Sequence, residues 1–552
     1  MEMEVVEAVS TCVVGASFLS SPIFKVLLLV VILVYLAQIL IIIRHRQRKS
    51  TFTAPLPPGP LPWPVVGNLP EMLLTEKKPP FRWMHSVMRE MGADDIACVK
   101  LGGVHVIPIT CPKIAREVLK TQDAIFASRP VAFAFSTFSG GYRSAVLSPY
   151  GDQWKKMRRV LSADIVCPSR HRWLHDKRAD EADNLTGYVY NKARRSAGAS
   201  GVVDVRHIAR HYCGNVIRRL LFNRRYFGEE PPRGDGGPGP LEMQHVEAVF
   251  ASVELICAFS ISDYLPWLLG LDLDGHEKDV KEAHKIVNRL HDRVIDERWR
   301  QWKRGEKQEV EDLLDVFITL KDTKGRPLLT IEEVKAQSQE ITLAAMDNPS
   351  NAVEWALAEL VSNPELLEKA VKEMDHVVGR DRLVQESDIP RLNYLKACIR
   401  EAFRLHPVAP FNVPHVALAE TTVAGYRVPE GSHVLLSRVG VGRNPAVWDD
   451  PLRFNPDRHI VATTAAEVTL AENDLRFISF STGRRGCVAV QLGTAMSVML
   501  FGRLLQGFTW SKPAGVAAVD LSESRHNMFM AKPLVLRAQP RLPAELYPTI
   551  SN

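Results

Sequence analysis

The stretch that decides the fold reads FSTGRRGCVA, residues 480–489. Its two glycines let a tight loop approach another group closely, and Cys487 stands at the end of that loop. Residues 488–505 follow with the apolar spacing of a helix. A thiol at the start of a helix faces unpaired N–H groups and the positive end of the helix dipole, which favours its thiolate form. The loop therefore predicts a cysteine with a special chemical task.

An arginine two residues before this cysteine adds to that prediction. Arg485 can pair with an anion that lies beside the Cys487 thiolate. A thiolate and an arginine around a flat ligand with two carboxylates fit heme, with the arginine on a propionate. A lone cysteine is more often a buried structural residue, so the loop alone leaves both interpretations open.

Three distant elements favour the heme interpretation. Glu401 and Arg404 place opposite charges three residues apart on one helix face. The segment 451–459 supplies Arg458, which can close a buried charge network with that pair. Trp154 and Arg158 put an indole N–H and a guanidinium one helical turn apart, where both can reach propionates.

These elements occur in the order and spacing of a cytochrome P450, a family that the whole chain resembles. The resemblance implies a mainly α fold with small β-sheets, in which one large domain buries heme b between a long central helix and the cysteine loop. It implies that Cys487 is the axial ligand of the heme iron and that Arg485, Trp154 and Arg158 contact the propionates. It also implies that Glu401, Arg404 and Arg458 form a structural charge triad.

The central helix departs from the family's pattern at residues 344–349, which read AAMDNP. The family's acid is present as Asp347, but Asn348 replaces the hydroxyl residue that helps to protonate bound dioxygen. Pro349 has no N–H for the carbonyl of Ala345, so we expect the helix to open beside the iron. Asp347 and Asn348 are the expected catalytic residues, and loss of oxygen activation is the alternative.

The Asn-Pro pair is similar to that of one plant subgroup, the amino-acid N-monooxygenases that form aldoximes. Residues 411–415 (FNVPH) and the pair Arg458-His459 agree with this resemblance. His415 lies where many relatives have a propionate-binding arginine. The implied reaction is two N-hydroxylations of an L-amino acid, followed by loss of water and carbon dioxide, giving an (E)-aldoxime.

Aromatic residues in the expected pocket suggest an aromatic substrate, phenylalanine first and then tyrosine or tryptophan. They are Phe133, Phe135, Phe138, Tyr142, Phe411 and Phe529. Arg143 can hold the substrate carboxylate or lie at a propionate or on the surface. An aliphatic substrate is the first alternative. An oxygen-independent heme-thiolate isomerase or dehydratase, and a non-catalytic heme-binding or scaffold protein, are the others.

The implied reaction needs O2 and electrons. No flavin module is recognisable after the cysteine loop, so the electrons must come from NADPH through a separate NADPH-cytochrome reductase. Basic residues near the loop, such as Arg484, can meet an acidic surface of that partner.

Residues 26–43 (VLLLVVILVYLAQILIII) predict a transmembrane signal anchor. As a helix they span about 27 Å, close to the hydrocarbon thickness of a bilayer. The basic cluster that follows places the rest of the chain in the cytosol. We therefore expect a short lumenal N-terminus (1–25), a basic stop-transfer and proline-rich neck (44–64) and a cytosolic monooxygenase domain (65–552), held as a single-pass protein in the endoplasmic reticulum membrane.

The composition fits a globular protein that does not bind nucleic acid. The 552 residues include 69 basic and 63 acidic side chains, so the net charge is only +6. The eight cysteines form no CxxC pair, which argues against a zinc ribbon and a dense disulfide scaffold. The basic and aromatic run at 298–304 (RWRQWKR) is better explained as a solvated helix face than as a nucleic-acid patch.

Local signals predict several elements of this domain. Thr330 and Glu333 form a capping box that opens a helix through Ala345. Asn363-Pro364 caps a helix that runs to Asp375, and another covers about 392–405. Runs at 97–109, 422–428 and 433–436 predict strands.

Overall fold

The computed structural model describes residues 54–74, 79–195, 201–228, 235–460 and 467–549, with isolated positions between 26 and 34. The expected lumenal segment 1–25, most of the expected anchor 26–43 and the expected neck up to residue 53 therefore lie outside the described residues. All structural statements below concern the described part of the chain.

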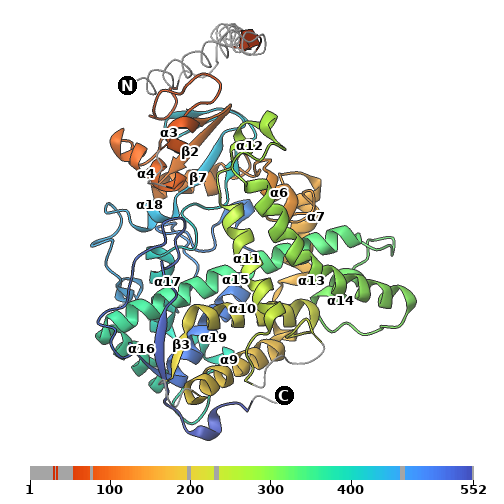
Figure 1. Cartoon of the computed structure of the whole chain (residues 1–552), viewed down its shortest axis with the longest axis vertical. Coiled ribbons are helices and arrows are strands. Elements are labelled where there is room, and N and C mark those ends of the chain that lie inside the picture. Colours follow the sequence, from red (N-terminus) through yellow and green to blue (C-terminus); the bar gives the residue numbers. More distant parts are fainter. Residues whose placement is uncertain are drawn as a thin grey trace, which may run out of the picture.

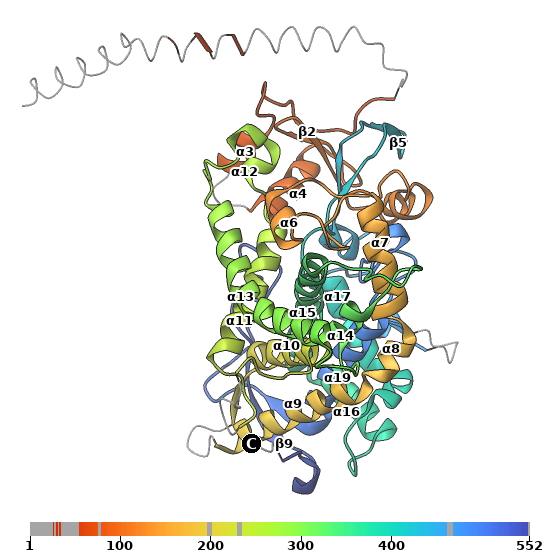
Figure 2. The same ribbon diagram turned by 90° about the vertical axis from the view of Figure 1, so that its right-hand side faces the viewer.

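A long buried helix, α15 (Ile331–Ser362), runs through the middle of the molecule (Figure 1). Figure 2 shows α15 nearly end-on, with other helices packed around it. These are α10 (Val205–Phe222), α11 (Pro240–Ile256), α13 (His276–Arg304), α14 (Leu313–Thr319), α16 (Pro364–Val377), α17 (Asn393–Leu405) and α19 (Val490–Gly507).

Shorter helices complete the outer part of the domain. They are α3 (Leu69–Leu74), α4 (Pro80–Glu90), α5 (Pro112–Arg116), α6 (Phe133–Phe138), α7 (Asp152–Val160), α8 (Pro168–Trp173), α9 (His175–Arg195), α12 (Ile261–Tyr264) and α18 (Arg438–Gly442). Single helical turns of other pitch lie at Glu117–Thr121, Leu161–Ile165, Pro266–Leu268, Glu386–Arg391, Pro456–His459, Gly483–Arg485 and Ala544–Leu546.

The strands form small sheets at two ends of the helical body. The four-stranded sheet has the order β1 (Val99–Leu101), β2 (Val104–Ile109), β7 (His433–Leu436), β4 (His415–Val416), and only β2 and β7 are parallel. A three-stranded antiparallel sheet has the order β3 (Val202–Asp204), β9 (Val535–Pro540), β8 (Phe508–Ser511). β5 (Thr421–Val423) and β6 (Tyr426–Val428) form a hairpin.

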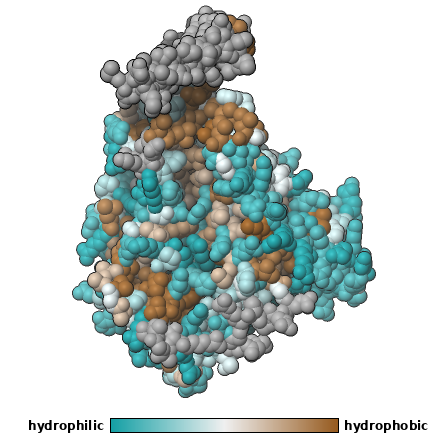
Figure 3. Space-filling view, in the orientation of Figure 1, coloured by the Kyte–Doolittle hydropathy of each residue, from teal (hydrophilic) through white to brown (hydrophobic). Residues whose placement is uncertain are grey.

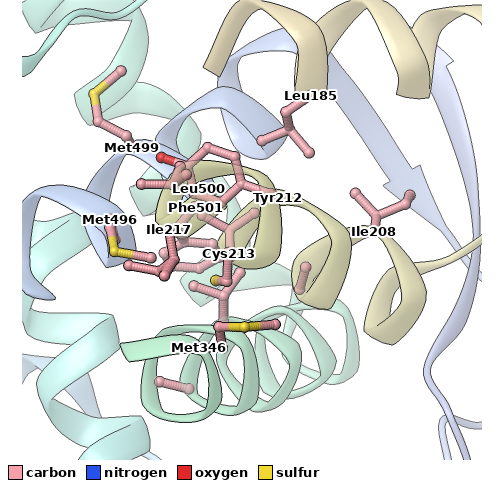
Figure 4. Packing of buried hydrophobic residues seen from close by; sticks show 14 of the residues in the cluster. Leu185, Ile208, Tyr212, Cys213, Ile217, Met346, Met496, Met499, Leu500 and Phe501 are labelled. Atoms are coloured by element: carbon pink, nitrogen blue, oxygen red, sulfur yellow. The ribbon is translucent and has the colours of Figure 1, made fainter. Parts of the chain in front are cut away.

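The fold is held by one large apolar core between α9, α10, α15 and α19 (Figure 4). Tyr212 and Cys213 of α10 meet Met346 of α15 and Phe501 of α19 there, and all of these side chains are buried. Burying a side chain of this size stabilises a fold by about 1.5–3 kcal/mol. This core fixes α15 against α19, the helix that follows the cysteine loop.

The beginning of α15 confirms the predicted capping box. The Glu333 N–H donates to the Thr330 hydroxyl at 3.3 Å, and the Thr330 N–H donates to the Glu333 carboxylate at 2.9 Å. The predicted interruption is wrong, because α15 continues through Pro349 to Ser362. Most side chains of that second half are buried, and their packing keeps the chain helical past the proline.

Most other local predictions are confirmed. The predicted strand runs contain β1, β2, β5, β6 and β7, and the predicted helices are α16 and α17. One detail is wrong: the Asn363 amide donates to the Glu359 carbonyl at 2.8 Å instead of capping α16. In the basic run at 298–304, Arg298 is buried against Asp312 and Asp315, so that face is not simply solvated.

Among the described residues, one stretch, Pro240–Tyr264, is long and apolar enough to cross a membrane by length and composition. It contains α11, which packs on α13, α10 and α15 as a core helix does. Hydrophobic residues also gather at the surface near α3 and α12 (Figure 3). Leu61, Trp63, Leu74 and Trp267 are exposed there by 59–91 %.

Candidate heme and substrate site

The cysteine loop holds the Cys487 sulfur in a fixed position at the start of α19. The Cys487 N–H donates to the Phe480 carbonyl at 2.8 Å, and its Sγ accepts from the Ala489 N–H at 3.3 Å. Gly483 has φ +72°, and a Cβ there would lie 2.0 Å from a main-chain oxygen of a neighbouring segment. Only glycine fits that position, so the loop conformation depends on it.

The protein groups around Cys487 act on its pKa in opposite directions. Burial raises the pKa of the Cys487 thiol, and the Ala489 N–H and the charges of Arg158 and Arg438 lower it. A further cation beside the sulfur would favour the thiolate. A metal cation replaces the proton of a cysteine ligand, so iron can supply this stabilisation.

Helix α7 places two of the predicted propionate contacts beside the cysteine. Trp154 is buried, and Arg158 is half-buried. No acceptor in the described part of the chain bonds the Arg158 guanidinium, whose charge interacts with Cys487. Burial lowers the pKa of Arg158. An arginine with free donors in this position suits a carboxylate ligand.

Arg485, another of the predicted propionate contacts, bonds main-chain carbonyls of the segment before α7. Its guanidinium lies over the Trp154 ring, 4.5 Å from the centroid, and donates to the carbonyls of Ala127 at 2.5 Å, Ser148 at 2.8 Å and Ala145 at 3.2 Å. Burial lowers its pKa to about 9. Arg485 thus ties the cysteine loop to the segment before α7 and holds the Trp154 ring in place.

His415, at the start of β4, has one free ring nitrogen. Its Nδ1 lies 2.7 Å from the Phe126 carbonyl, while its buried Nε2 has no partner among the described residues. Burial, followed by the charge of Arg129, lowers the pKa of His415 to about 3. Bonding a carboxylate through Nε2 requires a proton there, which a neighbouring anion would favour. The free donors of Arg158, the free Nε2 of His415 and the Cys487 sulfur together fit heme.

A buried charge network ties α17 to the segment before the cysteine loop. The Glu401 carboxylate accepts from Arg404 at 2.7 Å, lies 2.8 Å from the His459 Nε2, and forms an ion pair with Arg458 at 3.0 Å. Burial alone would raise the Glu401 pKa, but the bonds from Arg404 and His459 hold it at about 2. The three predicted charges meet, and His459 joins them as a fourth member.

Asp347 on α15 faces a cavity of about 810 Å³. Its carboxylate is buried, and Oδ1 has no partner in the described chain. Burial raises the pKa of Asp347 to about 7; Arg210 and Arg438 lower it, and Glu254 raises it. Other acidic residues line the same cavity, namely Glu247, Glu254, Asp279 and Glu282. Asp347 is therefore a proton acceptor or donor near neutral pH.

Asn348 lies on another face of α15 from Asp347. It is half-buried, it follows the exposed Ala344 by one turn, and it does not line the 810 Å³ cavity. No protein group in the described residues bonds its carboxamide. The two predicted catalytic residues therefore face different surroundings.

The predicted aromatic pocket is divided by the fold. Phe529 lines the 810 Å³ cavity, whereas Phe135 and Phe411 line a smaller one of about 60 Å³ that shares Pro410 with it. Phe133, Phe138 and Tyr142 line neither cavity. Phe138 belongs to the buried core.

The structure places Arg143 at the surface and shows a second arginine, Arg438, that the sequence did not single out. Arg143 is exposed and bonds the Gly140 carbonyl of its own loop, which agrees with the surface position among its three expected places. Arg438, which stands in an otherwise small and apolar run at 434–442, is half-buried beside Asn412. No spacing or motif in the sequence distinguishes Arg438, because its neighbours come from other segments.

Comparison with known proteins agrees with this geometry. The family model "Cytochrome P450" matches residues 57–537. The chain is 72% identical to a tyrosine N-monooxygenase of Sorghum bicolor, covering 100% of this chain and 99% of the relative. It is 57% identical to tryptophan N-monooxygenase 1 of Arabidopsis thaliana (90% of both chains) and 51% identical to valine N-monooxygenase 1 of Manihot esculenta (97% of both). With the cysteine loop, the Glu401 network and a family match over most of its length, the chain belongs to the cytochrome P450 family of heme-thiolate oxidoreductases.

Proposed function

We propose that this protein is an amino-acid N-monooxygenase that converts an L-amino acid into its (E)-aldoxime by two N-hydroxylations, dehydration and decarboxylation. One observation carries the proposal: 72% identity over the whole chain to a relative named for N-monooxygenation of tyrosine. The Asp347-Asn348-Pro349 sequence of α15 supports it, since it replaces the family's usual hydroxyl with a carboxamide.

The site is proposed to hold heme b through residues of this chain. Cys487 would bind its iron, Arg158 and a protonated His415 would bind its propionates, and Arg485 and Trp154, which stack on each other, would support that side of the site. The bound heme supplies dioxygen activation with electrons that NADPH delivers through a separate reductase.

Asp347 prepares the substrate amine. An ammonium group has no lone pair to oxidise, so it must first lose a proton. The unpartnered Oδ1 of Asp347 can accept that proton inside the cavity, because its pKa of about 7 matches neutral pH. The free carboxamide of Asn348 can hold water or a polar substrate group by hydrogen bonds.

The substrate is proposed to be aromatic, with tyrosine first. The order expected from the sequence, phenylalanine before tyrosine, is reversed here because a relative named for tyrosine is 72% identical, whereas a relative named for phenylalanine is 54% identical. An aliphatic substrate is the second candidate, favoured by 51% identity to a relative named for valine. Phe529, at the wall of the 810 Å³ cavity, can contact an aromatic ring.

The protein is proposed to be anchored in the endoplasmic reticulum membrane by residues 26–43, with residues 65–552 in the cytosol. The sequence of that segment and the exposed apolar residues near α3 and α12 support this arrangement. NADPH-cytochrome reductase is the proposed partner, and exposed basic residues such as Arg484 are its proposed contact.

The test is turnover by the full-length protein in membranes with a plant NADPH-cytochrome reductase. Each of tyrosine, phenylalanine, tryptophan, valine and isoleucine is supplied alone, and aldoximes are identified by mass spectrometry. We expect tyrosine oxime, formed only with both NADPH and O2. Product from valine or isoleucine alone would contradict the aromatic assignment, and product without O2 would favour an isomerase or dehydratase.

A further inference from the structure

Arg438 is a half-buried cation whose hydrogen bonds are incomplete. Its backbone N–H donates to the Pro410 carbonyl at 2.9 Å, and one Nη donates to the Asn412 side chain at 3.3 Å. Its Nε is buried and has no partner among the described residues. Buried guanidinium nitrogens are normally bonded, so this one points to a ligand that is not part of the protein.

Residues bonded to Arg438 or close to its charge line the two cavities, although Arg438 itself lines neither. Its charge interacts with Cys257, Asp347 and Cys487. Cys257 and Pro410 line both the 60 Å³ and the 810 Å³ cavity, and Asn412 lines the smaller one. Burial lowers the pKa of Arg438, which adds to the cost of leaving it unpaired.

Arg438 and Asp347 form an open pair of opposite charges. The charge of each acts on the other, yet no hydrogen bond joins them, and both Nε of Arg438 and Oδ1 of Asp347 lack partners. An α-amino acid carries a carboxylate and an amine on one carbon. It can satisfy both groups at once, whereas an amine without a carboxylate offers no anion to Arg438.

We propose that Arg438 binds the α-carboxylate of the amino-acid substrate and directs its amine toward Asp347. This inference rests on the proposed function and adds the residue that selects amino acids over simple amines. A heme propionate is the other carboxylate near the site. Its contacts, however, are proposed on α7 and β4, whereas the charge of Arg438 interacts with Cys257 and Asp347 more strongly than with Cys487.

The test compares substrate binding to heme-loaded wild type, Arg438→Gln and Arg438→Lys by optical titration of the iron spin state. The probes are tyrosine and tyramine, which differ only in the carboxylate. Loss of a charged hydrogen-bond pair is expected to weaken tyrosine binding about 10- to 100-fold in Arg438→Gln, with less than about a 3-fold change for tyramine. The tyrosine affinity of Arg438→Lys is expected to lie between those of wild type and Arg438→Gln. Arg300→Gln, which changes an exposed arginine, serves as the matched control.

The outcomes separate this inference from the proposed function. An unchanged ratio of tyrosine to tyramine affinity in both Arg438 variants would overturn it, as would a ratio that moves only in Arg143→Gln. Loss of bound heme with an unchanged ratio would assign Arg438 to a propionate and likewise overturn it. If wild type binds no amino acid at all, the proposed function fails first.

Discussion

The Nε2 atom of His459 lies 2.8 Å from Oε2 of Glu401. Both side chains are fully buried, and Arg404 holds the same carboxylate through two further bonds of 2.7 Å. The carboxylate therefore bonds α17 and the segment 456–459 together at one point. Removing it would leave two guanidinium groups and an imidazole facing each other without an anion.

Glu401→Gln is expected to destabilise the protein by about 3–5 kcal/mol, because it leaves the buried Arg404 charge unpaired. His459→Ala is expected to cost about 1–3 kcal/mol, since Arg404 still bonds the carboxylate. Thermal unfolding of the heme-loaded variants measures both. A smaller effect for Glu401→Gln than for His459→Ala would contradict the central place of the carboxylate.

The Glu401 contribution depends on pH with a definite sign. The folded pKa is about 2, below the usual 4.5, so the ionised carboxylate stabilises the fold fully above pH 4.5 and progressively less as pH falls toward 2. The stability gap between wild type and Glu401→Gln should therefore be constant from pH 5 to 7 and narrow below pH 4.5. A gap that widens in acid would show that another group dominates.

The raised pKa of Asp347 predicts that its contribution to folding stability depends on pH in the opposite sense. Its folded pKa of about 7 exceeds the usual 3.8, so the fold loses stability as pH rises from 4 to 7 and the buried carboxyl is forced to ionise. Asp347→Asn should therefore raise the melting temperature more at pH 8 than at pH 5. It should also remove the rise in turnover through pH 7 that we expect of wild type. If Asp347→Asn raised the melting temperature equally at pH 5 and pH 8, burial would not be raising the pKa of Asp347.

A substitution of Pro349 tests whether the Ala345 carbonyl, which receives no N–H from residue 349, has a role in the reaction. Pro349→Ala restores an N–H donor to Ala345 inside a continuous helix, so we expect stability to rise by about 1–3 kcal/mol. If the free carbonyl holds water or substrate, kcat for oxime formation should fall at the same time. Higher stability with unchanged kcat would leave the carbonyl without a role, and Ala352→Gly, at a fully helical position, controls for general softening of α15.

Arg158 tests the proposed heme contacts. Its guanidinium has no protein acceptor in the described chain, so Arg158→Gln should cost little in the apoprotein fold but should lower the fraction of protein that retains heme. Arg159→Gln, one residue along and exposed, is the matched control. Heme content is measured by the pyridine hemochrome assay. Equal heme content in the two variants would show that Arg158 does not bind a propionate.

The features that could be predicted from the sequence are those whose interacting residues lie close together along the chain. The turn before Cys487, the Glu401/Arg404 pair and the Thr330/Glu333 cap are local patterns, so their geometry follows from helix and loop dimensions. The continuation of α15 through Pro349 was not predictable, because it depends on packing against α10 and α19. The same holds for Arg438, whose neighbours come from four separate segments, and for the aromatic residues that the fold divides between two cavities.

The central claim is that the Cys487 sulfur binds the heme iron as a thiolate. The most direct test is the carbon monoxide difference spectrum of the reduced protein for wild type, Cys487→Ser and the control Cys167→Ser. We expect wild type and Cys167→Ser to show the long-wavelength band of a thiolate-bound carbonyl complex, and Cys487→Ser to lose that band together with oxime formation. A Cys487→Ser protein that keeps both the band and its turnover would contradict the account.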